Sequence, residues 1–395
     1  MTTPYSPPPE LVAALDRLKR RSLLAGAAAM ALCAVGFFTS REQFFRSYLV
    51  AFVFWNGLAL GSLAIGMLHQ MTGGAWGIVI RRVLGAATRT FPASLALFLP
   101  LAFGLPALYQ WARPELVAAD HLLHLKAPYL NVPFFLGRSA LYFAIWIALV
   151  HLLNKWSLAQ DYSTAEPYHT RLQMLSGPGL LLYGATVTFS SIDWVMSLDP
   201  HWFSTIYGIL FMGGQGVGAL ALVIAVLPLL VRHEPLKSAI THKHVHDLGK
   251  LLFAFIMLWA YFSFSQFLIV WSANLPEEIP WYLTRMNGGW QWIGLALILF
   301  HFVLPFLLLL SRDAKRNRRI LAPVAVGILA MRVVDLFWMA APSFAERVSV
   351  HWLDLAALAG VGGLWLAAFF HQLQQRPLLP VHDPMLEEAL AHGRH

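Results

Sequence analysis

The sequence predicts an all-α integral membrane protein with about ten transmembrane helices. Three observations lead to this prediction: an apolar composition, a series of apolar runs long enough to cross a bilayer, and an uneven distribution of basic residues between those runs. Hydrophobic residues make up 58% of the 395 residues and charged residues only 12%, and the mean hydropathy is +0.60. A water-soluble domain has roughly twice that share of charged residues. The chain therefore belongs in a lipid bilayer.

A transmembrane helix needs roughly 20 apolar residues, because it rises about 1.5 Å per residue through a hydrocarbon core of about 30 Å. Ten runs meet or approach that length, and in chain order they are 23–38, 48–71, 91–108, 134–153, 179–198, 205–230, 247–272, 290–310, 320–340 and 351–371. No clear signal-peptide cleavage site follows the first run, so we expect a retained helix. The chain then divides into an N-terminal arm (1–22), a transmembrane domain (23–371) and a C-terminal tail (372–395).

Basic residues distinguish the two sides of the predicted helix bundle. If the N-terminus is cytoplasmic, the segments on that side hold 19 of the 28 Lys and Arg residues, and the opposite loops hold six. Lysine and arginine are enriched in the cytoplasmic loops of membrane proteins. We therefore expect both termini, and the basic loop 311–319, in the cytoplasm. The net charge of +8 fits this membrane orientation, so we expect no nucleic-acid partner.

Several cofactor chemistries are excluded by residue content. The single cysteine, Cys33, cannot form an internal disulfide, hold an iron–sulfur cluster or attach a haem through CxxCH. Walker A, GxGxxG and HExxH motifs are also absent from the sequence. Histidines occur in or beside apolar runs at His69, His151, His301 and His371, but no pair has a spacing that indicates haem or metal ligation. We expect no metal site and no covalently bound cofactor.

The fifth apolar run carries a carboxylate, Asp193, where an unpaired charge costs several kcal/mol. Tyr183, Thr186, Ser190, Asp193 and Ser197 follow one another at intervals of three or four residues, so they share one helix face over roughly 21 Å. Such a polar face suits a proton path with Asp193 near its outer end. The structural alternative is that the hydroxyls bond to carbonyls of their own helix and Asp193 joins two helices. Arg138 in the fourth run is the candidate partner cation.

A second polar set occupies the later runs. Asp247 and Lys250 form an i, i+3 pair at the cytoplasmic end of the seventh run, and Tyr261 lies near its middle. His301 lies in the middle of the eighth run, and Arg332 and Asp335 form an i, i+3 pair in the ninth. In a proton path, Asp247 and Lys250 would lie at the cytoplasmic entrance, and Tyr261 and His301 would lie in mid-membrane. For each charged pair, the alternative is a clamp between helices.

Two long segments carry a family resemblance. They are "SSIDWVMSLDPHWFSTIYGILFMGGQ" (190–215) and "HDLGKLLFAFIMLWAYFSFSQFLIVWSANLPEEIPWYLTRMNGGW" (246–290). Both resemble signature segments of the ActF-type membrane subunit of alternative complex III, a bacterial quinol:cytochrome c oxidoreductase. The resemblance implies an NrfD-like (polysulfide-reductase-type) fold with two four-helix bundles, 48–198 and 205–340, and two flanking helices, 23–38 and 351–371.

The resemblance also implies a location and partners. These are the bacterial inner membrane, a second NrfD-like membrane subunit, a periplasmic iron–sulfur subunit, haem c subunits and a terminal oxidase. Iron–sulfur clusters and haem c are then expected only in the partner subunits. Within the family, quinol oxidation is assigned chiefly to the other NrfD-like subunit.

The residues and the resemblance together predict a membrane subunit that contributes a proton path to quinol oxidation in an assembled complex. A quinone or quinol site is a further hypothesis, with Arg138, Asp193 and His69 as candidate binding residues. Three alternatives remain. They are a purely structural docking subunit, a secondary transporter with broken helices, and a diheme cytochrome b-like oxidoreductase.

Overall fold

The computed structural model describes residues 5–163 and 167–392, and every regular element within them is a helix. Nine helical segments of the described chain are long and apolar enough to cross a membrane. They are α1 (Pro9–Thr39), α2 (Arg41–Thr72), α4 and α5 (Arg81–Thr88 and Phe91–Phe103), α9 (Val132–Gln160), α11 (Tyr207–Leu230), α13 (His242–Ala273), α15, η3 and α16 (Trp290–Ala296, Leu297–Val303 and Leu304–Leu310), α18 (Arg318–Ala340, continued by η4, Ala341–Ser343) and α19 (Trp352–Leu373). The prediction of an all-helical chain is confirmed for these residues, and the nine long apolar segments fit a multi-pass membrane protein.

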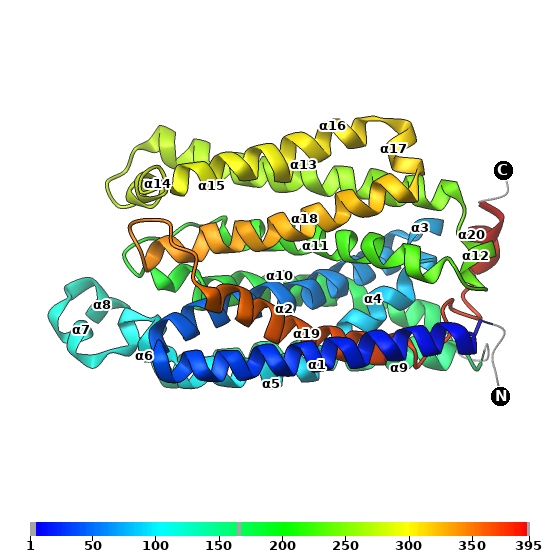
Figure 1. Cartoon of the computed structure of the whole chain (residues 1–395), viewed down its shortest axis with the longest axis horizontal. Coiled ribbons are helices and arrows are strands. Elements are labelled where there is room, and N and C mark those ends of the chain that lie inside the picture. The colour runs from blue at the N-terminus through cyan, green and yellow to red at the C-terminus, as the bar shows by residue number, and fades with distance from the viewer. Residues whose placement is uncertain (1–4, 164–166, 393–395) are drawn as a thin grey trace.

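The remaining predicted crossing corresponds to α10 (Tyr168–Trp194), which is less apolar than the other nine. This 27-residue helix carries the polar face that ends at Asp193. It packs against α9, α11 and α2 and runs alongside them (Figure 1). Packing against these neighbours, rather than an apolar composition, therefore buries one face of α10.

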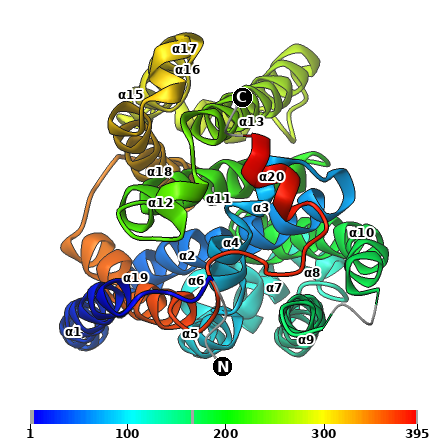
Figure 2. The same ribbon diagram turned by 90° about the vertical axis from the view of Figure 1, so that its right-hand side faces the viewer.

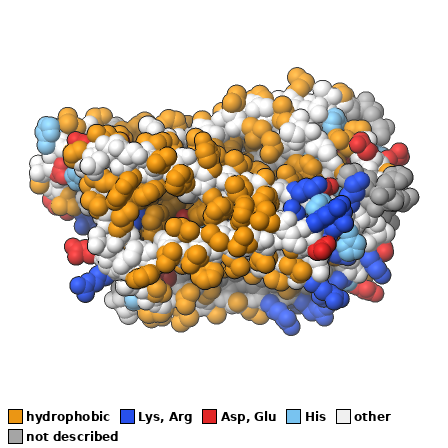
Figure 3. Space-filling model, turned by 90° about the horizontal axis from the view of Figure 1, so that it is seen from above, with side chains coloured by type: hydrophobic (Ala, Val, Ile, Leu, Met, Phe, Trp, Pro, Cys, Tyr) orange, Lys and Arg blue, Asp and Glu red, His pale blue; other side chains and the backbone are white. Residues whose placement is uncertain are grey.

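Short helices close the two ends of the long ones. At the end that holds both termini are α3 (Ala75–Ile78), α12 (Leu236–Ala239), α17 (Arg312–Arg316) and α20 (Leu386–His392) (Figure 1). At the opposite end are α6 (Leu105–Leu108), η1 (Gln110–Ala112), α7 (Pro114–Ala119), α8 (His121–Lys126), η2 (Met196–Leu198) and α14 (Pro280–Arg285). Figure 3 shows an apolar belt between these ends, with Lys and Arg gathered mainly at the end of the termini.

The long helices form two rings of four. In the first bundle, α2, α5, α9 and α10 each contact the next, and α10 contacts α2. In the second bundle, α11 contacts α13 and α18, while the α15–α16 segment contacts both α13 and α18. Contacts of α11 with α2 and α10 join the two bundles. The helices α1 and α19 pack on each other, and both contact α2 of the first bundle (Figure 2).

The described parts of the predicted arm and tail, residues 5–22 and 372–392, pack against the helix bundle. Helix α1 begins at Pro9 rather than near residue 23, because Leu11 and Leu15 are buried and Asp16 pairs with Lys19 at 2.6 Å along the same helix. The C-terminal segment crosses the end of the first bundle (Figure 2), and the Leu378 amide donates to the Tyr5 carbonyl at 2.8 Å. These segments therefore form part of the folded unit.

The two bundles approach each other closely at a glycine on α2. A Cβ atom on Gly61 would lie 2.0 Å from the backbone oxygen of Gln215 on α11. Only glycine fits this contact, because any larger residue would push the helices apart. The close approach brings the Gln215 side chain to the boundary between the bundles.

Candidate functional site

Asp193 is fully buried at the end of α10 and faces Arg138 on α9. Arg138 donates to both carboxylate oxygens, from Nε to Oδ2 at 2.9 Å and from Nη2 to Oδ1 at 2.8 Å. The Tyr142 hydroxyl also donates to Oδ2, at 2.7 Å. Removal of either charge would leave the other buried without its counter-ion, which is strongly destabilising. This geometry is that of a clamp between α9 and α10.

Aromatic rings complete the surroundings of the Arg138 guanidinium. Its central carbon lies 3.8 Å from the ring centroid of Tyr129 and 4.3 Å from that of Phe134, so both rings contribute cation–π attraction. Burial raises the pKa of the Tyr129 hydroxyl to about 12, and the Asp193 carboxylate contributes in the same direction. Tyr129 therefore remains a neutral phenol beside the ion pair.

The hydroxyl side chains of the predicted polar face are all buried. Thr186 accepts a hydrogen bond from Trp146 Nε1 at 2.8 Å, and Ser197 accepts one from Trp111 Nε1 at 3.1 Å. Thr186, Ser190 and Ser197 each donate to a carbonyl of their own chain, at 2.7, 3.2 and 2.6 Å. Because an indole only donates, these bonds fix the hydroxyls in place rather than joining them into a continuous proton wire.

The polar face crosses to the second bundle at Tyr183. Its hydroxyl donates to Gln215 Oε1 on α11 at 2.7 Å. Gln215 and Arg332 line a cavity of about 10 Å³ between α2, α11 and α18, which has room for about one water molecule. A Cβ atom on Gly214 would lie 2.3 Å from the Arg332 guanidinium, so the glycine allows the arginine to lie against α11. Polar groups of both bundles therefore meet at this cavity.

Beyond the cavity, Arg332 forms an ion pair with Asp335 on the same helix. Asp335 Oδ2 also accepts a hydrogen bond from Trp259 Nε1 on α13 at 3.0 Å. The Trp259 ring stacks on His301, with centroids 4.0 Å apart. The four residues form one buried cluster, which we call the second-bundle cluster.

His301 is the least satisfied member of the second-bundle cluster. It is fully buried, and neither ring nitrogen has a hydrogen-bond partner among the described residues. It lies in a π-helical stretch, Leu297–Val303, and such interruptions occur frequently at functional sites. In the neutral ring one nitrogen carries a proton and the other can accept one, so, within the described part of the chain, His301 has an unused donor and an unused acceptor.

Gln266 on α13 was not anticipated from the sequence. It is 2% exposed, and within the described chain neither its amide oxygen nor its nitrogen has a partner. Gln266 follows Trp259 by seven residues, which puts both on one face of the helix. This spacing is the only sequence signal that could have identified it. Buried amides without partners are rare, so a bound water is the expected neighbour.

Three predicted residues lie away from these groups. Tyr261 is 64% exposed on the outer face of α13, not in mid-bundle beside His301. Lys250 and Asp247 do pair, at 3.3 Å, but the lysine side chain is 57% exposed. The pair is a surface contact of small energetic value.

His69 is also separate from the other quinone candidates. Its Nε2 atom lies 3.0 Å from the Gly74 carbonyl oxygen, and its ring contacts Trp76, so it stabilises the turn after α2. Phe52, whose ring contacts Trp194 beside Asp193, precedes His69 by 17 residues, or roughly 25 Å of helix. Arg138 and Asp193 lie together, but each is the main partner of the other.

Among the described residues, no group of three or more His, Cys, Asp or Glu side chains is arranged to hold a metal ion. No family model matches the chain, and no curated protein matches it.

Proposed function

We propose that this chain is a proton-conducting membrane subunit of a bacterial respiratory quinol:cytochrome c oxidoreductase of the alternative complex III type. The observation that carries the proposal is the buried polar connection from Tyr183, through Gln215, to the cavity that Arg332 also lines. Ionisable groups buried in transmembrane helices mark proton relays in many membrane proteins, which supports a functional role for this row.

Proton transfer along this row uses groups that can both accept and donate a proton. The Tyr183 hydroxyl, one water in the cavity between the bundles, the Asp335 carboxylate and the His301 imidazole meet this condition. Trp259 positions Asp335 by its hydrogen bond and His301 by stacking. Arg332 compensates the charge of Asp335. Asp193 serves as the anchor of the first bundle through Arg138.

The resemblance of segments 190–215 and 246–290 to the ActF-type subunit supports the choice of complex. The two rings of four helices agree with an NrfD-like fold with flanking helices α1 and α19. The basic side chains at the end of both termini favour a cytoplasmic location of that end (Figure 3). In this proposal quinol is oxidised mainly in a second NrfD-like subunit, while haem c and iron–sulfur subunits carry the electrons.

The proposal is tested first by purification from native membranes in mild detergent. A tagged chain is expected to co-purify with haem c, iron–sulfur and second membrane subunits. Recovery of the chain without any of these partners would contradict the proposed complex. The same preparation then supplies the sample for turnover measurements.

The proton path is tested with Tyr183→Phe and His301→Gln in the purified complex. Each variant removes a group that exchanges protons but keeps a side chain of similar size. We expect proton release per electron and quinol oxidation to fall at least about tenfold, since positioned acid–base groups contribute about 10²-fold or more. Tyr261→Phe, on the outer face of α13, is the matched control and should behave as wild type. Normal turnover and proton stoichiometry in both test variants would disprove the path.

A structural docking subunit is the second candidate. It is favoured by the two buried ion pairs, Arg138–Asp193 and Arg332–Asp335, each of which has an additional aromatic donor. Groups held in this way are typical of clamps between helices. In that case Tyr183→Phe and His301→Gln lower the stability of the complex but leave its turnover unchanged.

A further inference from the structure

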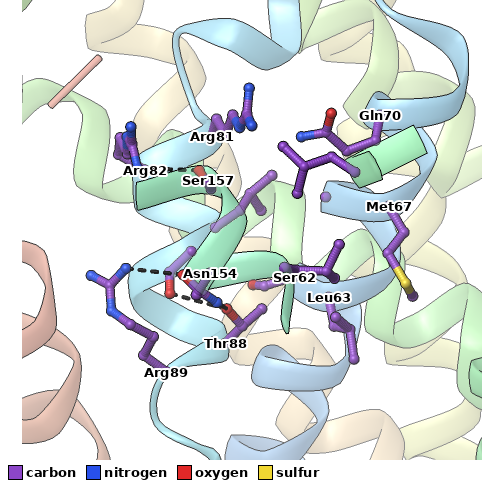
Figure 4. Close-up of a pocket in the computed structure, with 15 residues that line it drawn as sticks. Ser62, Leu63, Met67, Gln70, Arg81, Arg82, Thr88, Arg89, Asn154 and Ser157 are labelled. Atoms are coloured by element: carbon purple, nitrogen blue, oxygen red, sulfur yellow. Dashed lines mark hydrogen bonds between the residues drawn. The ribbon is translucent and has the colours of Figure 1, made fainter. Parts of the chain in front are cut away.

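A second cavity lies in the first bundle, at the end that holds both termini. It has a volume of about 60 Å³ and is lined by side chains of α2, α4, α9 and α10 (Figure 4). Its charged lining residues are Arg81, Arg82 and Arg89, and no Asp or Glu side chain lines it. The volume has room for about four to six water-sized atoms. This matches the five heavy atoms of a phosphate group.

The arginines around this cavity outnumber the carboxylates that pair with them. Arg81 pairs with Asp383 of the C-terminal segment, and Arg82 pairs with Asp161 at the end of α9. Neither carboxylate lines the cavity. Each of these two pairs is electrically neutral. Any positive charge left without a counter-ion at the cavity must therefore belong to another arginine.

Arg89 has only neutral hydrogen-bond acceptors among the described residues. It donates to Gln372 Oε1 at 2.9 Å, to the Gln372 carbonyl oxygen at 2.6 Å and to Asn154 Oδ1 at 3.1 Å. Arg376 reaches the same Asn154 oxygen at 3.2 Å, and burial lowers its pKa. Arg89 therefore carries a guanidinium charge that no carboxylate in the described chain balances. Arg376 does not line the cavity, and the charge of Asp161 acts on it.

Arg285, at the opposite end of the molecule, is a useful comparison. It too is buried and bound by carbonyl oxygens, those of Trp281, Trp338 and Met339 at 2.9, 3.2 and 2.7 Å. Its guanidinium also lies 3.4 Å from the Trp281 ring centroid. Protein groups thus fill that site, whereas Arg89 borders an open space that it shares with two more arginines.

An unused donor also belongs to a residue that lines the cavity. Arg82 is 5% exposed, and its Nε atom has no hydrogen-bond partner in the described chain. A buried donor without an acceptor and a cation without a counter-ion require the same kind of ligand, an anion with several oxygens.

We infer that this cavity is a binding site for a phosphate-bearing anion. Two sources supply that chemistry, inorganic phosphate and the headgroup of an anionic phospholipid in the leaflet at this end of the bundle. Basic pockets between transmembrane helices on the cytoplasmic side bind such headgroups. The inference is independent of the proposed proton path, which lies between Tyr183 and His301.

The test uses the full-length protein, purified in detergent and depleted of lipid. Its melting temperature is followed by tryptophan fluorescence during titration with inorganic phosphate, dioctanoyl phosphatidylglycerol or dioctanoyl phosphatidylcholine. A saturable rise with phosphate identifies the soluble anion, and a rise with phosphatidylglycerol alone identifies the lipid headgroup. No rise with either, or an equal rise with phosphatidylcholine, overturns the inference. These outcomes require only the wild-type protein.

The variant Arg89→Gln locates the site. It should weaken the apparent affinity about tenfold, equivalent to about 1.4 kcal/mol. Arg232→Gln removes an exposed arginine at the same end of the protein and should bind as wild type. Equal affinities for wild type and Arg89→Gln would overturn the assignment to this cavity.

Discussion

The Arg138–Asp193 pair allows a quantitative test of how the first bundle is held together. Three variants are needed: Arg138→Gln, Asp193→Asn and the double variant. Each single substitution removes one charge and leaves the other buried, because Arg138 is 8% exposed and Asp193 is fully buried. Breaking a buried pair from one side costs about 3–5 kcal/mol.

The two single variants should lose different amounts of stability, because the charge that remains keeps different contacts in each. After Asp193→Asn, Arg138 retains the Tyr129 carbonyl at 3.0 Å and the rings of Tyr129 and Phe134. After Arg138→Gln, the Asp193 carboxylate retains the Tyr142 hydroxyl as its side-chain partner. We expect Arg138→Gln to destabilise by about 1–2 kcal/mol more, because each cation–π contact contributes about 0.5–2 kcal/mol.

The double variant measures the coupling of the pair. It removes both charges together, so its loss of stability should be at least about 2 kcal/mol smaller than the sum of the two single losses. The assay is reversible unfolding in mixed micelles, followed by circular dichroism. A coupling energy below about 0.5 kcal/mol would be within the range of independent sites and would refute the clamp.

Three further predictions concern other parts of the molecule. Gly214→Ala should lower stability by about 1–3 kcal/mol, measured by thermal unfolding, because its Cβ would meet the Arg332 guanidinium at 2.3 Å; Gly327→Ala, whose Cβ would meet nothing within 4 Å, is the control, and equal effects would contradict the reasoning. Hydrogen bonds from the α8 backbone amides and His201 hold the pKa of Asp120 below its ordinary value of 3.8. The N-cap of α8 should therefore persist above about pH 4 and be lost as the pH falls further, which amide exchange of α8 measures; unchanged protection at pH 2 would contradict this. A membrane-impermeant thiol reagent added from the periplasm should label Asn274→Cys and not Asn317→Cys, since the two residues lie at opposite ends of the bundle (Figure 1); the reverse pattern would invert the proposed orientation.

Local spacing in the sequence predicted which side chains are buried together on one helix. The intervals from Tyr183 to Ser197 place five polar groups on one face, and all five are buried. Arg138 could be named as the partner of Asp193, because it is the only cation within the fourth or fifth apolar run. These conclusions need only helical periodicity and the high energy of a lone charge in lipid.

Contacts between distant helices could not be derived in the same way. Periodicity assigns Tyr261 to a helix but does not say which face of α13 is covered, and the structure places that side chain on the outer face. The bond from Tyr183 to Gln215 depends on the packing of α10 against α11. Likewise, the pair of Arg81 with Asp383 joins residues 302 positions apart. Such pairings depend on the packing of the whole chain.

The composition of α10 has a consequence for how the chain enters the membrane during synthesis. An aspartate adds about 2.5–3.5 kcal/mol to the apparent insertion free energy at the centre of a helix and less towards the end, where Asp193 lies. Helix α10 is also less apolar than its neighbours. Helix α9 precedes it and carries Arg138, so the two can leave the translocon as one hairpin with a neutral ion pair. Replacing Arg138 should then raise the fraction of nascent chains in which α10 fails to insert. A glycosylation site engineered into the loop after α10 would measure that fraction, and an unchanged value would show that α10 inserts unaided.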